Sequence, residues 1–399
     1  VGGLYFWEKG SENGFQNSGF ILDTNSIFLA NFGPLGPSFA AANPARYRMV
    51  QTRARLKYTT SAESTALYGQ ATFYPGGRDS GIRLTAGGRY TWDEKIMLRT
   101  QNGAAPPLAP ETGRAKFSKF TWNLMAGYDV ADGINLYARA ATGYRSGGFN
   151  SQDPAITGTN QLGSFKPEKV TSYEIGLKSE LFNRRLRFNV AAYHNIYDNL
   201  AVLGPVTNAP VGTFATRIIN AGKVVYNGFE VETQAVLTDN FSLDGSLGYI
   251  DINYKEFLAG QSPTPGAPPV NIAPIVTPGF TSPLTANVAL NAQFPLNWGN
   301  ATLRGRIGYT HEDGKYNFSS SVGSPFNEQI KGDDIDLIDA QIGIDGIPLG
   351  TGEGEVRLWV KNLTNAKDFV RSIDYGQLGF AGGYYAEPRT YGITVGAKF

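Results

Sequence analysis

The sequence predicts an all-β protein, an antiparallel transmembrane β-barrel, from three observations. Short segments alternate apolar and polar side chains, as strands with one greasy and one wet face do. The composition, with 49 Gly, 13% aromatic residues and only 3 Met in 399 residues, favours strands and turns over helices. No apolar stretch approaches the ~20 residues that a membrane-spanning helix needs, so a membrane can be crossed here only by strands.

The alternation predicts fourteen strands. They are expected at residues 2–9, 64–74, 81–95, 116–130, 134–146, 170–182, 185–199, 215–237, 240–255, 281–294, 299–313, 333–346, 353–366 and 387–399. In the last of these, Tyr391, Ile393 and Val395 share one face with the final Phe399. The phase of each segment predicts lipid-facing side chains at Leu84, Leu136, Leu177, Val190, Leu290, Leu303, Leu358 and Val395.

One strand is less regular, because the apolar phase of 240–255 shifts between Tyr249 and Ile250. A β-bulge at this point would explain the shift, and so would a strand that leaves the bilayer there.

The connections between these strands alternate in length. Short ones are expected at 75–80, 131–133, 183–184, 238–239, 295–298 and 347–352, and long ones at 10–63, 96–115, 147–169, 200–214, 256–280, 314–332 and 367–386. An outer-membrane barrel has tight periplasmic turns and long outer loops, so this alternation predicts both chain ends on the periplasmic side.

Two turns predict strand register. If Asn183-Arg184 is a two-residue turn, Leu181 faces Leu186, and Glu180 faces Arg187 as a cross-strand ion pair on the lumen face. If 131–133 is a three-residue loop with Gly133 in the left-handed conformation, Val130 faces Ile134, Tyr128 faces Leu136 and Ala126 faces Ala138.

Several classes of function find no support in the residues. A net charge of +1 is not the excess of basic residues that nucleic-acid binding favours, and without Cys there are no disulfides. The only histidines, His194 and His311, fall on apolar phases near a membrane boundary, where a place beside Tyr or Trp is favoured over metal binding. Asp334 and Asp336 have no ligand-spaced loop beside them. We therefore expect no catalytic site, no metal site and no cofactor.

Candidate ligand contacts lie in the long connections, where exposed aromatic rings need an explanation. These candidates are Tyr144, Phe149, Tyr254, Phe257, Tyr316, Phe318, Tyr375, Phe380, Tyr384 and Tyr385. For any single ring, packing within a loop or at the membrane boundary is an equally good interpretation. Charged residues of the polar phase, such as Arg304, Arg306 and Arg357, are expected to face a wet lumen, first of all as a structural requirement.

Six blocks of the chain resemble the TonB-dependent receptors of Gram-negative outer membranes. The blocks are Gly87 to Lys95 with its Gly-x-Arg-Tyr core, Leu136 to Asn150 with Tyr-Arg-Ser-Gly-Gly-Phe-Asn, Pro167 to Lys178, Asn220 to Glu232, Val360 to Asn365, and the terminal strand Pro388 to Phe399. The resemblance implies an outer-membrane barrel that takes up a scarce chelate or cofactor, such as a ferric siderophore. The implied partners are outer-membrane lipid, the substrate and the TonB complex, reached through an N-terminal region.

The chain also departs from the family, whose members have a 22-stranded barrel filled by an N-terminal plug. Fourteen strands and no plug-like region predict that residues 1–399 are one barrel domain, lacking the plug and roughly eight strands. A reduced, self-closed barrel of fourteen strands is the alternative. For function, a passive porin and a surface-binding barrel stay open beside active uptake.

Overall fold

The computed structural model describes residues 1–23, 47–103, 109–151, 160–205, 216–220, 222–260, 270–319, 324–375 and 380–399. Strands dominate these ranges, and the helical segments among them are the short 3-10 turns η1 (Arg78–Ser80) and η2 (Ala273–Ile275). No helix in the described ranges is long and apolar enough to cross a membrane.

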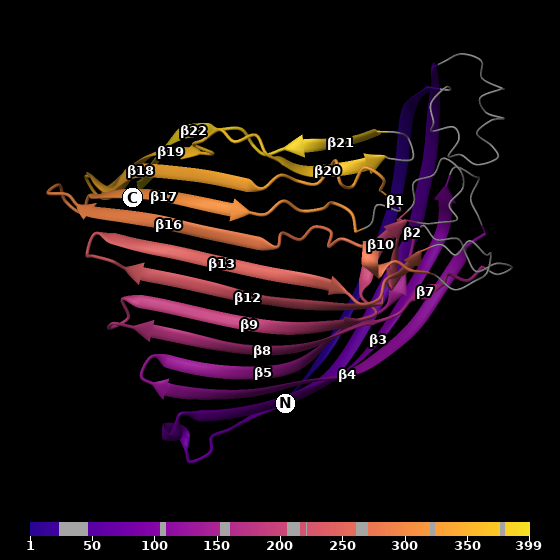
Figure 1. Cartoon of the computed structure of the whole chain (residues 1–399), viewed down its shortest axis with the longest axis horizontal. Coiled ribbons are helices and arrows are strands. Elements are labelled where there is room, and N and C mark those ends of the chain that lie inside the picture. The colour runs from indigo at the N-terminus through magenta and orange to yellow at the C-terminus, as the bar shows by residue number, and fades with distance from the viewer. Residues whose placement is uncertain are drawn as a thin grey trace.

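Fourteen of the described strands form one antiparallel sheet that curves as a wall (Figure 1). In chain order they are β1 (Gly2–Asp23), β2 (Tyr47–Phe73), β3 (Ile82–Gly103), β4 (Glu111–Ala131), β5 (Ile134–Arg145), β8 (Glu168–Leu181), β9 (Leu186–Asp198), β12 (Lys223–Val236), β13 (Phe241–Tyr254), β16 (Leu284–Pro295), β17 (Thr302–Glu312), β18 (Ile335–Leu349), β19 (Gly352–Lys361) and β22 (Thr390–Lys398). Every predicted segment contains one of these strands, so the all-β antiparallel prediction is confirmed.

The remaining strands form small ladders within the long connections. They pair β6 (Gly148–Phe149) with β7 (Ser164–Phe165), β10 (Ala201–Pro205) with β11 (Thr216–Asn220), β14 (Leu258–Gly260) with β15 (Val270–Asn271), and β20 (Phe369–Tyr375) with β21 (Phe380–Tyr385). Short and long connections alternate along the sheet as predicted. The long connections lie at the end of the wall that is on the right in Figure 1.

The sheet is open in the described part of the chain. β1 and β22 are its two edge strands, and the described pairings include no ladder between them. The ladder that a self-closed barrel requires between 2–9 and 388–398 is therefore not found. Both chain ends lie at the short-turn ends of their strands, since Gly2 pairs with Tyr68 near the end of β2 and Lys398 pairs with Glu353 near the start of β19.

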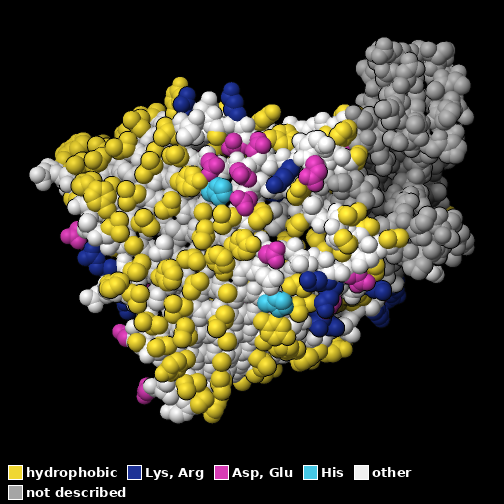
Figure 2. Space-filling model, in the orientation of Figure 1, with side chains coloured by type: hydrophobic (Ala, Val, Ile, Leu, Met, Phe, Trp, Pro, Cys, Tyr) yellow, Lys and Arg dark blue, Asp and Glu magenta, His cyan; other side chains and the backbone are white. Residues whose placement is uncertain are grey.

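The two faces of the sheet differ in chemistry as the alternation predicts. Large apolar side chains such as Leu136, Leu290 and Leu358 are exposed on one face, and hydrophobic side chains cover the strands on the face seen in Figure 2. On the other face Arg187 lies 3.0 Å from Glu180, and Arg83 bonds Asp129. Since charges are costly in hydrocarbon, the apolar face is the lipid face and the charged face is the lumen face.

The hairpin at Asn183-Arg184 has the predicted register. Leu181 pairs with Leu186 and Glu180 with Arg187. The Arg185 N–H donates to the Phe182 carbonyl at 3.2 Å, and Asn183 and Arg184 have φ of 55° and 65°. Phe182 also has φ of 55°, so left-handed backbone runs through three successive residues of this tight turn.

The second predicted turn is wrong by one pair. Tyr128 pairs with Leu136 and Ala126 with Ala138 as expected, and Gly133 has φ of 73°. However, the register shifts after Asp129, so Ala131 and not Val130 pairs with Ile134. The bulge at Val130 shortens the loop to two residues while leaving the rest of the strand in phase.

Two of the predicted long connections are largely strand. β1 and β2 continue through residues 10–23 and 47–63, and β3 and β4 continue through 96–103 and 111–115, whereas 24–46 and 104–108 lie outside the described residues. A strand of about ten residues spans a bilayer, so these extensions rise beyond it. Beyond the bilayer a strand need not keep one face apolar, so a search for an apolar face misses such extensions.

The predicted strand 215–237 is two strands. Gly222, with φ of 113°, separates β11 from β12, and β11 turns away to pair with β10. A Cβ at Gly222 would lie 2.7 Å from the Glu256 carbonyl oxygen, so the backbone of the next connection approaches closely here. The chain can leave the sheet at this point because the residue is glycine.

Candidate ligand-binding site

The candidate aromatic residues lie on the long-loop side of the wall, but their exposure differs. Tyr384 and Tyr385 are each 68% exposed, whereas Phe257 is only 3% exposed. Phe257 packs edge-on against Tyr254, with ring centroids 5.3 Å apart, so it supports Tyr254 and is closed to a ligand. The side chain of Tyr375 lies outside the described residues.

Tyr316 and Phe318 belong to a folded outer loop between β17 and β18. The Tyr316 hydroxyl donates to Glu328 at 3.0 Å, and the Lys331 ammonium lies 5.3 Å from the ring centroid. Burial, together with the hydrogen bond to Glu328, raises the pKa of Tyr316. The buried amide of Asn327 donates to the Phe318 carbonyl at 3.0 Å, which ties this part of the loop to its other half.

This loop joins the β20–β21 hairpin, which carries Tyr384 and Tyr385. The hydroxyl of Ser372 in β20 donates to the Ile330 carbonyl at 3.0 Å, and the Tyr316 carbonyl accepts from the Phe280 N–H at 2.7 Å. Tyr385 packs edge-on against Phe369 at 5.7 Å. The connections between β13 and β16, β17 and β18, and β19 and β22 thus form one cluster. In its β20–β21 hairpin the rings of Tyr384 and Tyr385 are exposed.

A second cluster joins the connections after β5 and β9. The Asn150 side chain both donates to the Ile218 carbonyl and accepts from its N–H, at 2.9 and 2.7 Å. The ring of Phe149 lies over Gly113, where a Cβ would meet it at 2.5 Å. Tyr144 is partly buried at the end of β5. These contacts hold Phe149 in a second cluster, and the Lys223 N–H joins this cluster to the connection after β13 by donating to the Glu256 carbonyl at 3.1 Å.

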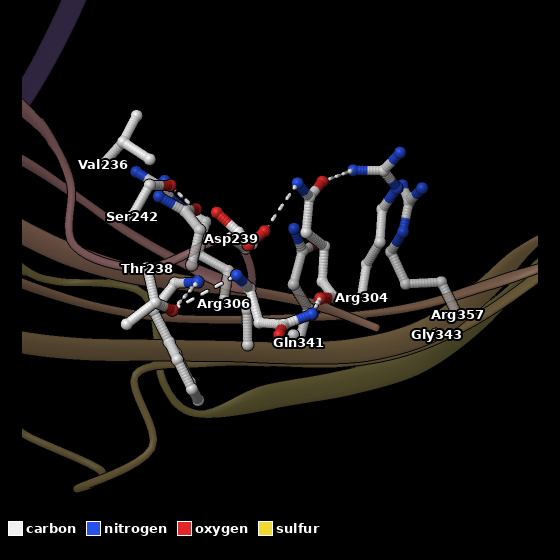
Figure 3. A pocket seen from close by; sticks show the side chains of 15 residues that line it. Val236, Thr238, Asp239, Ser242, Arg304, Arg306, Gln341, Gly343 and Arg357 are labelled. Carbon is white, nitrogen blue, oxygen red and sulfur yellow. Dashed lines mark hydrogen bonds between the residues drawn. The ribbon is translucent and has the colours of Figure 1, made fainter. Parts of the chain in front are cut away.

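An arginine-lined cavity lies on the lumen face near the short turns (Figure 3). It has a volume of about 400 Å³ and brings together Arg304, Arg306 and Arg357. Each of the three is paired, Arg306 with Asp244 at 2.7 Å, and both Arg304 and Arg357 with Asp345 at 3.0 and 3.3 Å. Arg357 also lies 3.3 Å from Glu355, so three carboxylates face the three guanidinium groups and the cavity is first a structural network.

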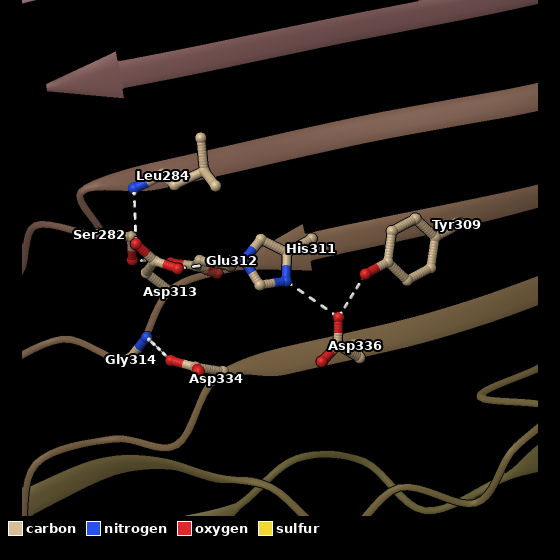
Figure 4. A network of polar contacts seen from close by, with 9 residues as sticks. All are labelled: Ser282, Leu284, Tyr309, His311, Glu312, Asp313, Gly314, Asp334 and Asp336. Atoms are coloured by element: carbon tan, nitrogen blue, oxygen red, sulfur yellow. Dashed lines mark hydrogen bonds and ion pairs between the residues drawn. The ribbon is translucent and has the colours of Figure 1, made fainter.

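A polar network ties the loop ends of β16, β17 and β18 together (Figure 4). His311 lies between two carboxylates, at 2.9 Å from Asp336 and 3.0 Å from Asp313, and Tyr309 also bonds Asp336. Asp313 accepts in turn from the Leu284 N–H at 3.1 Å. Among the residues that the structure describes, no group of three or more acidic, His or Cys side chains has the arrangement of a metal site.

Both histidines lie beside a tyrosine on the apolar face, as expected from their phase. His194 pairs with Tyr173, with ring centroids 6.3 Å apart, and its Nδ1 lies 2.7 Å from Asn227. Figure 2 shows both histidine side chains on the face that the hydrophobic side chains cover.

Sequence reasoning missed a set of tyrosines on the lumen face. Tyr137, Tyr193, Tyr197 and Tyr226 lie in β5, β9 and β12, on the face opposite to Leu136, Ala192 and Phe229. The signal in the sequence that could have revealed an apolar region on the lumen face is the phase shift between Tyr249 and Ile250. The β12–β13 ladder runs from Val224 to Val236 without a register shift, so the bulge interpretation is wrong there. After Tyr249 the strand leaves β16, and the apolar side chains turn from the lipid face to the lumen face.

The described sheet is an antiparallel wall with a lipid face and a charged lumen face. It has short turns at one end and folded loops at the other. These features define an outer-membrane β-barrel protein. The family model described as "TonB dependent receptor-like, beta-barrel" matches residues 5–389, and the chain belongs to this family. The family is one of receptors and transporters of the Gram-negative outer membrane.

Individual relatives are distant. The ferrichrome outer membrane transporter/phage receptor of Escherichia coli K12 is 24% identical over 293 residues, which are 73% of this chain and 33% of that protein. Among solved structures, the ferric yersiniabactin uptake receptor FyuA from Yersinia pestis superposes with a TM-score of 0.65 at 20% identity, over 88% of this chain and 50% of that chain. The siderophore receptor PiuA from Acinetobacter baumannii gives 0.59 at 16% identity, over 98% and 53%. The chain thus spans a third to a half of the length of these relatives.

Proposed function

We propose that this chain forms the barrel wall of a receptor for active uptake, which binds a scarce chelate such as a ferric siderophore in its outer loops. The observation that carries the proposal is the pair of folded loop clusters, one of which presents the exposed rings of Tyr384 and Tyr385. Exposed aromatic faces can supply binding energy without chemistry at the ligand. The names of the relatives, which include ferrichrome and ferric yersiniabactin receptors, support this class of ligand.

We also propose how the wall is completed. Further strands would pair with the free edges of β1 and β22, and a plug inside the lumen would connect the site to the TonB complex. The open sheet and the greater length of the relatives support this organisation. Transport would then be gated binding and release, and no covalent step would be needed.

The test is made on the full-length protein in intact cells. Replacing Tyr316, Phe318, Tyr384 and Tyr385 together by Ala should weaken binding of the transported ferric chelate by tenfold or more, because one ring at a binding hot spot typically contributes ~2 kcal/mol. The control Tyr128→Ala removes a ring from the lipid face and should leave binding unchanged. Unchanged affinity in the fourfold variant would exclude this loop cluster as the site, and uptake that persists without membrane energy would favour a porin.

A further inference from the structure

We propose that the lipid face of the wall carries a binding site for one phosphorylated lipid of the outer leaflet. Its acyl chains would lie in an apolar groove across β2, β3, β4, β5, β8 and β9, and a phosphate group would lie on Lys169 and Lys223. The site is on the outside of the barrel and therefore separate from the candidate site in the outer loops. It depends on the assignment of the lipid face and not on the proposed uptake.

The groove has a volume of about 1150 Å³, slightly above the usual range for pockets that hold small molecules. Larger side chains bound it, and among these Phe73 is 67% exposed and Ile175 is 64% exposed. Between them lie the small side chains of Ala71, Ala86, Ala126, Ala138, Ala140 and Ala192. Since this face meets hydrocarbon, an acyl chain is the group that fills the groove in a membrane.

The strand register places the groove on the lipid face. Ala138 lies two residues beyond the lipid-facing Leu136, and it pairs with Ile175, which pairs in turn with Ala192. A step of two residues keeps side chains on the same face of a strand. The groove is therefore open to the membrane and closed to the lumen.

Above the groove, the side chains of β8 change from apolar to charged in the order in which a lipid does. Ile175 is followed on the lipid face by Tyr173, Thr171 and Lys169. The six residues from Ile175 to Lys169 span about 20 Å along the strand, or about 15 Å along the membrane normal for a strand tilted by about 45°. This is half the thickness of the hydrocarbon core, so Lys169 reaches the level of the lipid phosphates when Ile175 lies near the midplane.

Lys169 and Lys223 lie on either side of Asp198, in one row at the loop end of the lipid face. Lys169 pairs with Asp198 in the β8–β9 ladder, and Lys223 pairs with the same residue in the β9–β12 ladder. Two strand spacings put the lysines about 10 Å apart, so their long side chains can meet on one phosphate. Among the residues that the structure describes, none of these three side chains takes part in an ion pair.

Other basic side chains on this face differ, because they are already paired. Arg114 and Lys116 lie toward the loop end of β4, and both contact Glu94 of β3. Figure 2 shows dark blue side chains gathered in the lower part of the view, where the hydrophobic surface ends toward the loops. Two ammonium groups and one carboxylate leave positive charge at Lys169 and Lys223, and such charge attracts anionic lipid.

The test measures lipid binding to the purified full-length receptor in detergent by native mass spectrometry. The probe is lipid A with two phosphate groups, and lipid A without phosphate is the reference. In the variant with both Lys169→Gln and Lys223→Gln, the affinity for the phosphorylated lipid should fall about 25-fold, roughly fivefold for each ammonium group lost near an anionic lipid. The affinity for the reference lipid should not change.

Lys116→Gln is the matched control for charge. It removes one ammonium group from the same face, but Glu94 already pairs with this group, so the affinity should change little. The fraction of folded receptor is measured for each variant by its gel shift, and binding is expressed per folded molecule.

Asp198→Asn gives a prediction of opposite sign. Removing the carboxylate between the two lysines should strengthen binding of the phosphorylated lipid by roughly fivefold, because less negative charge then opposes the phosphate. If the three side chains served only to hold the strands together, removing one of them would not strengthen lipid binding.

A further pair of variants tests the groove. Ala138→Leu together with Ala192→Leu fills it with side chains that suit the lipid face, so the barrel should still fold. The affinity for both lipids should fall by about threefold, since within hydrocarbon only packing contacts are lost. Ala286→Leu together with Ala340→Leu places the same side chains on the lipid face outside the groove and should have no effect.

Five results would overturn the inference. They are unchanged binding in the double Gln variant, unchanged binding in the groove variant, and weaker binding after Asp198→Asn. The fourth is displacement of the phosphorylated lipid by an equal concentration of inorganic phosphate, which would mean that the groove plays no part. The fifth is a dimer of the wild-type receptor that the groove variant abolishes, since a second copy of the chain would then cover the groove.

Discussion

At the scale of single residues, glycines decide where the large lumen side chains lie. Gly228 accommodates the Tyr193 ring, while Gly305 in β17 has no neighbour closer than 3.9 Å to an added Cβ. Neither residue has the positive φ that would itself favour glycine. A Cβ at Gly228 would also meet the Tyr249 carbonyl oxygen of the neighbouring strand, so the two positions separate the effect of close packing from the effect of a positive φ.

We predict that Gly228→Ala destabilises the barrel by roughly 1–3 kcal/mol, because the added methyl group must displace both the Tyr193 ring and the Tyr249 carbonyl of β13. Gly305→Ala should change stability by a few tenths at most, since its methyl group meets neighbours only at ordinary contact distances. Urea unfolding of the purified protein in detergent, followed by the gel shift between folded and unfolded forms, measures both. Equal stability of the two variants would contradict the close packing of the Tyr193 ring and the Tyr249 carbonyl at Gly228.

At the scale of strands and turns, the sequence could predict the features that follow from lipid on one face of the sheet and water on the other. Lipid on one face and water on the other enforce alternation, which located all fourteen sheet strands and the register of the 181–186 hairpin. The same signal fails where one environment is missing. Residues 10–23 of β1 and the residues of β13 after Tyr249 extend beyond the lipid. For the first, the pattern predicted a loop, and for the second it left open a bulge and a strand that leaves the bilayer, of which the bulge is wrong.

For the candidate site, too, the sequence could predict some features and not others. Composition and position could place Tyr316 and Tyr384 in outer loops, since exposed rings stand out in polar connections. They could not show that Phe257 is buried, nor that Ser372 and Ile330 draw two distant connections together. Those facts depend on contacts between loops, which no local pattern in the sequence encodes.

The turn at Asn183-Arg184 gives the prediction at this scale. Arg184 has φ of 65°, a conformation that costs a non-glycine residue roughly 1–2 kcal/mol. We expect Arg184→Gly to stabilise the hairpin by roughly 0.5–1 kcal/mol, part of the gain being offset by the greater entropy of glycine in the unfolded chain. Its ion pair with Glu180 is highly exposed, so its loss matters little. Arg187→Gly, in the strand itself, should destabilise the same hairpin in the same urea experiment. A destabilising Arg184→Gly would contradict the left-handed conformation of Arg184.

At the scale of the whole molecule, the wall separates two solvents, so one strand must satisfy lipid and water at successive residues. In β16, Val288 is 40% exposed on the lipid face, and the next residue toward the N-terminus, Asn287, faces the lumen, where its amide donates to Thr310 at 2.8 Å. Neighbouring positions with the same backbone conformation and the same strand partners thus differ in the side chain they need, apolar at Val288 and polar at Asn287.

We predict that Val288→Arg destabilises the barrel by roughly 2–4 kcal/mol, the penalty for a basic side chain near the bilayer midplane. Asn287→Arg should cost well under half as much, because its guanidinium group remains in the wet lumen and only one hydrogen bond is lost. The measurement is reversible unfolding of the full-length protein in lipid vesicles, with surface expression in cells as a second readout. Equal penalties at the two positions would mean that neither face meets lipid, and the assignment of a lipid face and a lumen face would then be wrong for the entire wall.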